Sequence, residues 1–339
     1  MQRVLCSGVG ALVALWGMAG CGPKALEPGA IDVTTEVIAL NPEAPDARAL
    51  GELTYRGGLE LFSTAPDFGG FSALEIHDDG DRILMLSDRG ALVSADLVFD
   101  EGGDLIGLQN AEIYPLLNRE GVRVHGREAD SEGLAHLGDG DYAISFERDH
   151  RIWVYHFGTD WEFLGTALPE PFALPPGTEL WPDNAGMEAL TLDSQGHVWA
   201  GVQDPLVDGQ PFTLWQFDEG GDPVAGALMG QPGFALTGLT PYGEGELLAL
   251  TRYWSRSVGN RARILHLDTR HLSGALAGDV LAELAPPLSV DNYEGIAYAP
   301  STSVGARLFL VSDNNFSDDQ RALLISFSLN ADAREDDAD

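Results

Sequence analysis

The segment Ser131-Glu132-Gly133-Leu134-Ala135 recurs in altered form four more times along the chain. Every copy places a polar or acidic anchor residue before a small residue, with an apolar residue after it. The five copies are Phe71-Ser72-Ala73-Leu74, Ser131-Glu132-Gly133-Leu134-Ala135, Met187-Glu188-Ala189-Leu190, Leu236-Thr237-Gly238-Leu239 and Tyr293-Glu294-Gly295-Ile296-Ala297. Successive anchors are 60, 56, 49 and 57 residues apart. A period of this length indicates a fold built from repeated units.

The residues after each anchor have the pattern of short strands joined by turns. A turn rich in Gly, Asp or Pro, such as residues 77–81, leads into an apolar strand. That strand ends on a polar residue 15 to 19 positions after the anchor. Third strands such as 151–155 and fourth strands such as 279–284 complete most units. Short strands separated by turn signals are typical of an all-β fold.

Four antiparallel strands per unit, repeated at this period, predict a β-propeller. The anchors count five blades, and a sixth blade in the longer intervals remains open. The last unit, which begins at Glu294, has three clear strands ending with residues 323–329. We expect its fourth strand to come from the N-terminal residues 52–62, because this pairing would close the ring and leave no free edge.

The N-terminus resembles an export signal. Arg3 precedes an uncharged apolar stretch, residues 4–16, which is shorter than the roughly 20 residues needed to span a bilayer. The following Met18-Ala19-Gly20-Cys21 resembles a bacterial lipobox. We therefore predict a signal peptide over residues 1–20 and a lipidated Cys21, with ordinary secretion as the alternative.

The rest of the chain divides into three parts. Residues 21–50 contain prolines and acids and predict a tether, residues 51–330 form the propeller domain, and residues 331–339 form an acidic disordered tail. Cys21 is the single cysteine of the mature chain, so no internal disulfide is expected. We expect an exported protein of the bacterial cell envelope, anchored by lipid at the outer membrane or cell surface.

The charge balance is strongly acidic, with 53 Asp and Glu against 19 Lys and Arg and a net charge of -34. Binding to nucleic acid is excluded, because phosphate contacts need clustered basic residues. Contact with a membrane is expected only through the N-terminal lipid. The expected partner is a small molecule, and the expected assembly state is a monomer.

Equivalent positions in successive blades form rings around the propeller axis. The first ring contains the anchors Ser72, Glu132, Glu188, Thr237 and Glu294, and the second contains Asp88, Glu147, Gln203, Arg252 and Asp313. Carboxylates brought together at a narrow mouth must bind a cation, pair with arginine or have raised pKa values. Candidate ligands for a hard cation, Ca²⁺ more readily than Mg²⁺, are Asp88, Glu132, Glu147, Glu188, Glu294 and Asp313.

Arginines accompany these acids. Arg89 and Arg148 follow directly after two second-ring positions, and Arg252 occupies a third. Such guanidinium groups would suit a phosphate or carboxylate ligand. In the alternative interpretation, the three anchor glutamates cap backbone N–H groups and only connect the blades. The sequence contains neither a G-x-S-x-G elbow nor an H-E-x-x-H zinc motif.

An ordered set of segments resembles the phytase-like propeller family, described by an esterase-like activity of phytase. The set covers most of residues 55–329. Its members are Leu86-Ser87-Asp88-Arg89-Gly90, Asp130-Ser131-Glu132-Gly133-Leu134-Ala135, Gly186-Met187-Glu188-Ala189-Leu190, Leu250-Thr251-Arg252-Tyr253, Arg261-Ala262-Arg263-Ile264, Asn292-Tyr293-Glu294-Gly295-Ile296-Ala297 and Val311-Ser312-Asp313-Asn314-Asn315-Phe316. The resemblance implies an exported propeller that hydrolyses phosphoester or other ester bonds with the help of a divalent cation.

Two functional hypotheses follow. In the first, the chain is a metal-assisted hydrolase in which Glu132, Glu188 and Glu294 are metal ligands or the general base. Arg89, Arg148 and Arg252 then hold the anionic group of the substrate. In the second, the chain is a non-catalytic propeller that binds a ligand or partner at the same mouth. The near absence of lysine argues against inositol phosphate itself as the substrate.

Overall fold

The computed structural model describes residues 26–205, 210–218, 221–270 and 275–330. Within these ranges nearly all regular structure is β, and the two 3-10 helices, η1 (Gly126–Glu128) and η2 (Thr178–Leu180), are single turns. No described helix is long and apolar enough to cross a membrane. The predicted signal peptide, the lipidation site Cys21 and the acidic tail lie outside the described residues.

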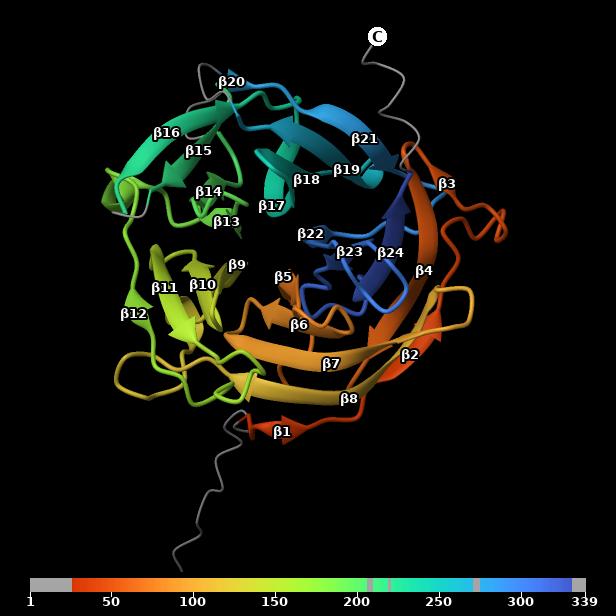
Figure 1. Cartoon of the computed structure of the whole chain (residues 1–339), viewed down its shortest axis with the longest axis horizontal. Coiled ribbons are helices and arrows are strands. Elements are labelled where there is room, and N and C mark those ends of the chain that lie inside the picture. Colours follow the sequence, from red (N-terminus) through yellow and green to blue (C-terminus); the bar gives the residue numbers. More distant parts are fainter. Residues whose placement is uncertain (1–25, 206–209, 219–220, 271–274, 331–339) are drawn as a thin grey trace, which may run out of the picture.

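The strands of the described residues form five four-stranded antiparallel units arranged around a central axis (Figure 1). The first unit consists of β5 (Phe71–Ile76), β6 (Arg82–Ser87), β7 (Ala91–Phe99) and β8 (Leu105–Pro115), and the second of β9 (Ser131–Gly138), β10 (Asp141–Phe146), β11 (Arg151–His156) and β12 (Glu170–Pro171). The third unit consists of β13 (Met187–Leu192), β14 (Val198–Val202), β15 (Phe212–Phe217) and β16 (Pro223–Leu228). The fourth consists of β17 (Phe234–Gly243), β18 (Glu246–Ser255), β19 (Gly259–Asp268) and β21 (Asp279–Leu284). The short β20 (Ala275–Leu276) extends the third unit.

The fifth unit closes the ring. It consists of β22 (Tyr293–Ala299), β23 (Arg307–Ser312), β24 (Leu323–Leu329) and the N-terminal β4 (Leu53–Phe62), which pairs antiparallel with β24. The predicted closure by residues 52–62 is therefore confirmed. The innermost strands β5, β9, β13, β17 and β22 each contact the innermost strands of both neighbouring units, which makes the propeller a closed ring.

The predicted tether, residues 21–50, is wrong from residue 26 onward. This N-terminal strap, residues 26–50, contributes β1 (Gly29–Ala30), which pairs with β8, and β2 (Thr34–Val37) and β3 (Ala49–Leu50), which pair with β4. Leu40 is only 1% exposed, and its carbonyl accepts the backbone N–H of Ser289 at 2.8 Å. The strap thus covers the outer edge of the closure.

We predict that Leu40→Ala lowers the free energy of unfolding by about 3 kcal/mol, because it leaves a cavity where the strap packs on the fifth unit. Urea denaturation followed by fluorescence measures the change. Val37→Ala is the matched control in the same strap: Val37 is 64% exposed, so its loss should change stability by less than about 0.5 kcal/mol. Equal, small effects of both substitutions would show that the strap adds nothing to stability.

Candidate functional site

A β-bulge positions each anchor side chain. In four units the pairing of the innermost strand with its neighbour skips one residue, and that residue is Ser72, Glu188, Thr237 or Glu294. In the second unit the extra residue falls at Glu132 or Gly133. Bulges re-aim side chains and are frequent beside active sites. The sequence repeat is therefore a repeat of bulges at one end of the channel, called here the acidic mouth.

Apolar side chains close the channel below the anchors. The void found between the innermost strands at this level has a volume of about 10 Å³, which holds one water at most. Its apolar lining includes Leu74, Leu134, Leu190, Leu239 and Ile296. A ligand of the acidic mouth consequently cannot pass through to the other face.

The three anchor glutamates lie together at this mouth, with exposures of 9% for Glu132, 7% for Glu188 and 8% for Glu294. Burial raises the pKa of Glu132 well above its usual value, and the charges of Glu188 and Glu294 raise it further. Burial likewise raises the pKa of Glu188, and it raises the pKa of Glu294 to about 8. Carboxyl groups in this state are poised either to keep a proton or to take a cation.

An arginine neutralises one side of the mouth. Arg252 Nη2 lies 3.2 Å from Glu294 Oε1, and its charge lowers the pKa of both Glu294 and Glu188. The buried amide of Asn292 donates to Glu294 Oε1 at 2.8 Å and to Asp313 Oδ2 at 3.3 Å. Arg252, predicted to bind substrate, is thus engaged with the carboxylates of the mouth itself.

On the other side, Asp130, Glu132 and Glu147 each offer a carboxylate oxygen, and these oxygens lie within 4.8 Å of one another. The predicted set of six metal ligands is therefore not one cluster among the described residues. Glu132 and Glu147 belong to this carboxylate triad, whereas Asp88, Glu188, Glu294 and Asp313 do not. The triad adds Asp130, which sequence reasoning missed although it stands directly before the Ser131-Glu132 repeat.

Asp88 is close enough to both Asp130 and Asp313 for their charges to act on it. Burial, together with the charges of Asp313 and Asp130, raises its pKa to about 7. Its Oδ1 atom is buried without a hydrogen-bond partner among the described residues. A buried carboxylate oxygen without a donor is costly. The free acceptor therefore fits a mouth that receives a cation or a donor group from a ligand.

An arginine cleft of about 730 Å³ opens beside the triad. Its basic lining consists of Arg89, Arg123, Arg127 and Arg148. Arg148 Nε lies 2.7 Å from Asp130 Oδ2, and the Arg89 guanidinium lies over the Phe316 ring at 3.3 Å. Arg89 and Arg148 thus lie beside Asp88 and Asp130 in the lining of this cleft. Arg123 and Arg127 were missed, because they lie in the loop between β8 and β9, outside the repeat register.

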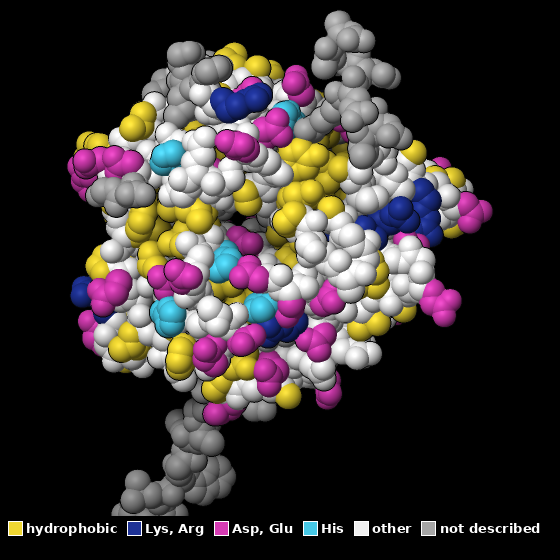
Figure 2. Space-filling model, in the orientation of Figure 1, with side chains coloured by type: hydrophobic (Ala, Val, Ile, Leu, Met, Phe, Trp, Pro, Cys, Tyr) yellow, Lys and Arg dark blue, Asp and Glu magenta, His cyan; other side chains and the backbone are white. Residues whose placement is uncertain are grey.

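The opposite mouth has a different character. A cavity of about 440 Å³ is lined there by residues of all five units, among them Glu75, His77, His136 and Tyr298. Figure 2 shows this face, with histidine and carboxylate side chains gathered around the central hollow. Glu75 Oε1 accepts the backbone N–H of His136 at 3.1 Å, and burial raises the pKa of Glu75 to about 8. Unlike the arginine cleft, this lining contains neither Arg nor Lys.

Residues 66–316 match the phytase-like family, described as having the esterase-like activity of phytase. The chain belongs to the phytase-like family. The matched range runs from the loop before β5 to the acidic mouth at Phe316, so it includes every residue of the triad and the arginine cleft.

Solved structures that resemble this phytase-like chain include two enzymes. A PQQ-bound aldose sugar dehydrogenase from Streptomyces coelicolor is 15% identical, with 88% of this chain and 100% of that chain covered and a TM-score of 0.42. A gluconolactonase from Xanthomonas campestris is 11% identical, with 89% and 97% covered and a TM-score of 0.44. Likenesses at this level assign no activity. No curated protein matches the chain.

We predict that Arg252→Gln destabilises the protein by about 2 kcal/mol at pH 9 and by much less at pH 5. The reason is that Arg252 lowers the pKa of Glu294 and Glu188. In Arg252→Gln the pKa values of Glu294 and Glu188 in the folded protein, which are already higher than in the unfolded chain, rise further. In both proteins the penalty for ionising these glutamates grows as the pH rises above their pKa in the unfolded chain. In the wild type the penalty from Glu294 levels off near pH 8, whereas in Arg252→Gln it continues to grow, so the stability difference between the two proteins appears above about pH 8.

Urea denaturation across this pH range measures the effect. Arg252→Lys, which keeps the charge, is the control and should lose less than half as much stability at pH 9. A loss in Arg252→Gln that is the same at pH 5 and pH 9 would show that Arg252 acts through packing and not through its charge.

Proposed function

We propose that this phytase-like propeller is an exported hydrolase of phosphoesters or other anionic esters, acting with a divalent cation. The observation that carries the proposal is the direct contact between two complementary elements. The carboxylate triad Asp130, Glu132 and Glu147 is joined to the arginine cleft by the 2.7 Å ion pair between Asp130 and Arg148. One element suits a cation, and the other suits an oxyanion.

The residues of the triad fit a hard cation such as Ca²⁺. Three carboxylate oxygens within 4.8 Å match the oxygen ligands that this ion prefers. Burial raises the pKa of Glu132, Glu147 and Asp130, so the cluster is charged at a cost that a cation would offset. When bound, the cation would polarise the ester and acidify a water molecule.

The remaining side chains would bind the substrate or transfer a proton. Arg89 and Arg148 orient the anionic group, because a planar guanidinium bonds two oxygens of a phosphate or carboxylate at once. Glu188, whose carboxylate is hydrogen-bonded by Gln203, is the candidate general base. Asn292 and Arg252 hold Glu294 in place. Apolar side chains below the anchors exclude bulk water from the channel.

A second candidate function is a non-catalytic ligand-binding propeller. The bonds from Arg252 and Asn292 to Glu294 favour it, because they engage one of the three anchor glutamates in a fixed network. Both candidates place the ligand in the arginine cleft. They differ in whether the triad supports turnover.

Export and lipid anchoring are part of the proposal and rest on residues 1–21. Radiolabelled palmitate should be incorporated into the full-length chain expressed in a Gram-negative host, and Cys21→Ser should abolish incorporation. Equal labelling of both chains would refute the anchor without affecting the hydrolase proposal.

We predict that Ca²⁺ raises the melting temperature of the protein by a few degrees after treatment with EDTA, because an ion that binds only the folded state stabilises it. Glu132→Gln should remove most of this rise, since it deletes one charge of the triad. Glu36→Gln, in the exposed strand β2, is the control and should keep the full rise. Differential scanning calorimetry with Ca²⁺, Mg²⁺ and Mn²⁺ identifies the ion. No rise with any of them would overturn the metal site.

We predict that Arg148→Gln lowers kcat/KM for an aryl phosphate by about 100-fold, the usual effect of removing one group that stabilises the transition state. Arg256→Gln, an exposed arginine in the β18–β19 turn on the same face, should stay within twofold of wild type. A panel of p-nitrophenyl phosphates and carboxylesters provides the assay. Saturable binding of inorganic phosphate without turnover of any ester would favour the binding propeller.

A further inference from the structure

A groove on the side of the propeller lies apart from both mouths. It has a volume of about 450 Å³ and lies between the outer strands of the first unit and the loop that follows β11. Strands β6, β7 and β8 contribute Arg82, Asp96 and Glu112, and the loop contributes Asp160 and Trp161. The strap supplies a further wall through Ala30 and Ile31. We propose that this side groove binds a neutral carbohydrate.

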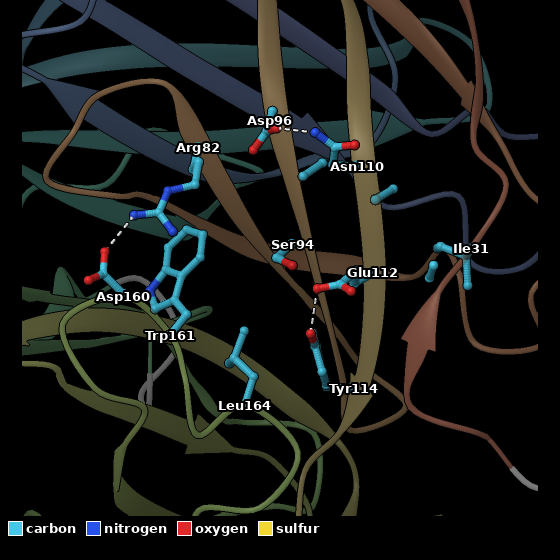
Figure 3. A pocket seen from close by; sticks show the side chains of 13 residues that line it. Ile31, Arg82, Ser94, Asp96, Asn110, Glu112, Tyr114, Asp160, Trp161 and Leu164 are labelled. Atoms are coloured by element: carbon cyan, nitrogen blue, oxygen red, sulfur yellow. Dashed lines mark hydrogen bonds and ion pairs between the residues drawn. The ribbon is translucent and has the colours of Figure 1, made fainter.

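The polar groups of the side groove are held in fixed pairs. Figure 3 shows three of them around a common space. Asn110 Nδ2 donates to Asp96 Oδ2 at 2.6 Å, and the Tyr114 hydroxyl donates to Glu112 Oε2 at 2.6 Å. Arg82 Nη2 donates to Asp160 Oδ1 at 3.1 Å. Side chains restrained in this way lose little entropy when a ligand binds.

Each pair leaves hydrogen-bonding capacity unused. A carboxylate accepts at both oxygens, and one oxygen of each acid is taken by its protein donor. The second oxygens of Asp96, Glu112 and Asp160 have no partner among the described residues. Three acceptors spread across one groove match a ligand with several hydroxyl donors.

The lining of the groove is mainly polar, and three large side chains contribute to its apolar part. Trp161, Leu164 and Ile31 line it, and Trp161 is fixed by its Nε1 donating to the Tyr142 hydroxyl at 2.8 Å. Pockets that combine apolar walls with a few placed polar groups are typical ligand sites. The C–H faces of a sugar ring would contact these walls while its hydroxyls meet the carboxylates.

The distribution of charge argues for a neutral ligand and against a single cation. The three carboxylates do not converge, and they are absent from the described cluster that could hold a metal ion. Arg82 is shared between Asp79 at 2.5 Å and Asp160 at 3.1 Å, so it offsets part of the charge of each, and it lies over the Trp161 ring at 5.3 Å. The groove therefore offers separate acceptors instead of one concentrated negative centre.

The backbone carries strain at Trp161. Its φ of 60° is a left-handed conformation that is unfavourable for a bulky residue, whereas Asn110, with φ 50°, is of a residue type that adopts this conformation readily. Strain of this kind persists where the surroundings impose it, and it gathers at ligand sites. In this groove Trp161 and Asn110 line the same space (Figure 3).

The test uses the purified exported chain and a defined panel: cellobiose, maltose, lactose and N,N′-diacetylchitobiose. Saturation-transfer NMR finds the disaccharides that bind, and calorimetry gives their Kd. We expect one-to-one binding with a Kd on the order of 1 mM or tighter. The Kd should be the same at about 0.05 M and about 0.5 M NaCl, because the disaccharides carry no charge and salt screens only the attraction between charged groups.

Substitutions locate the binding in the groove. Glu112→Gln keeps the size of the side chain but loses the charged acceptor, so it should weaken binding about tenfold. Gln109→Ala is the matched control on the same strand: Gln109 is exposed and does not line the groove, and its loss should change the Kd less than twofold. Glu132→Gln in the acidic mouth should leave carbohydrate binding unchanged, which separates this site from the proposed hydrolase site.

Three results would overturn the proposal. The first is that no disaccharide of the panel binds. The second is binding that Glu112→Gln leaves intact, which would place the ligand elsewhere. The third is tight binding of spermidine that weakens steeply with salt and is lost in Glu112→Gln, which would identify the groove as a site for organic cations.

Discussion

The arrangement of this propeller depends on a β-bulge in each innermost strand. The bulge inserts the anchor residue, and the small residue after it lets the neighbouring unit approach. At Gly133 a Cβ atom would lie 2.6 Å from Ser145 Oγ and 2.8 Å from the carbonyl oxygen of Glu188, so no side chain fits there. Hydroxyls then bond across units: Ser131 Oγ donates to the carbonyl of Ser87 at 2.7 Å, and Ser145 Oγ to that of Met187 at 2.5 Å. The same close approach that holds the ring together gathers the anchor side chains at one mouth.

Bringing these carboxylates together makes it costly to ionise them. The structure lowers this cost on one side of the acidic mouth more than on the other. On the side of the fourth and fifth units, Arg252 and Asn292 bond Glu294 directly. On the side of the second unit, Glu132 and Glu147 face Asp130, whose Arg148 partner also lines the arginine cleft. The pKa of Glu132 is accordingly raised by burial and by neighbouring acids, with no cation among its main causes. This asymmetry singles out the second unit as the place where an external cation would stabilise the fold most.

The sequence predicted those parts of the fold and of the site whose residues belong to the repeat. Glu132, Glu188 and Glu294 occupy equivalent bulges, so aligning the repeats was sufficient to bring them together, and the unpaired last unit indicated closure by β4. The strap was missed because its strands are two to four residues long and show no periodicity. Arg123 and Arg127 were missed because a connecting loop places them. The side groove depends on contacts between Arg82 and Asp160, 78 residues apart, which no repeat encodes.

The preference for arginine over lysine has a physical reason at the acidic mouth. A guanidinium is planar and can be oriented by stacking and by a bidentate partner, whereas an ammonium group is a flexible point charge. Arg89 lies on the Phe316 ring and Arg148 is held by Asp130, so both directions are set before a ligand arrives. Arg148 and Phe316 also have positive φ angles of 57° and 48°, a cost that only a fixed environment sustains. An oxyanion entering this cleft would meet guanidinium donors that are already oriented. Such preorganised donors are what would let an anionic group bind next to so many carboxylates.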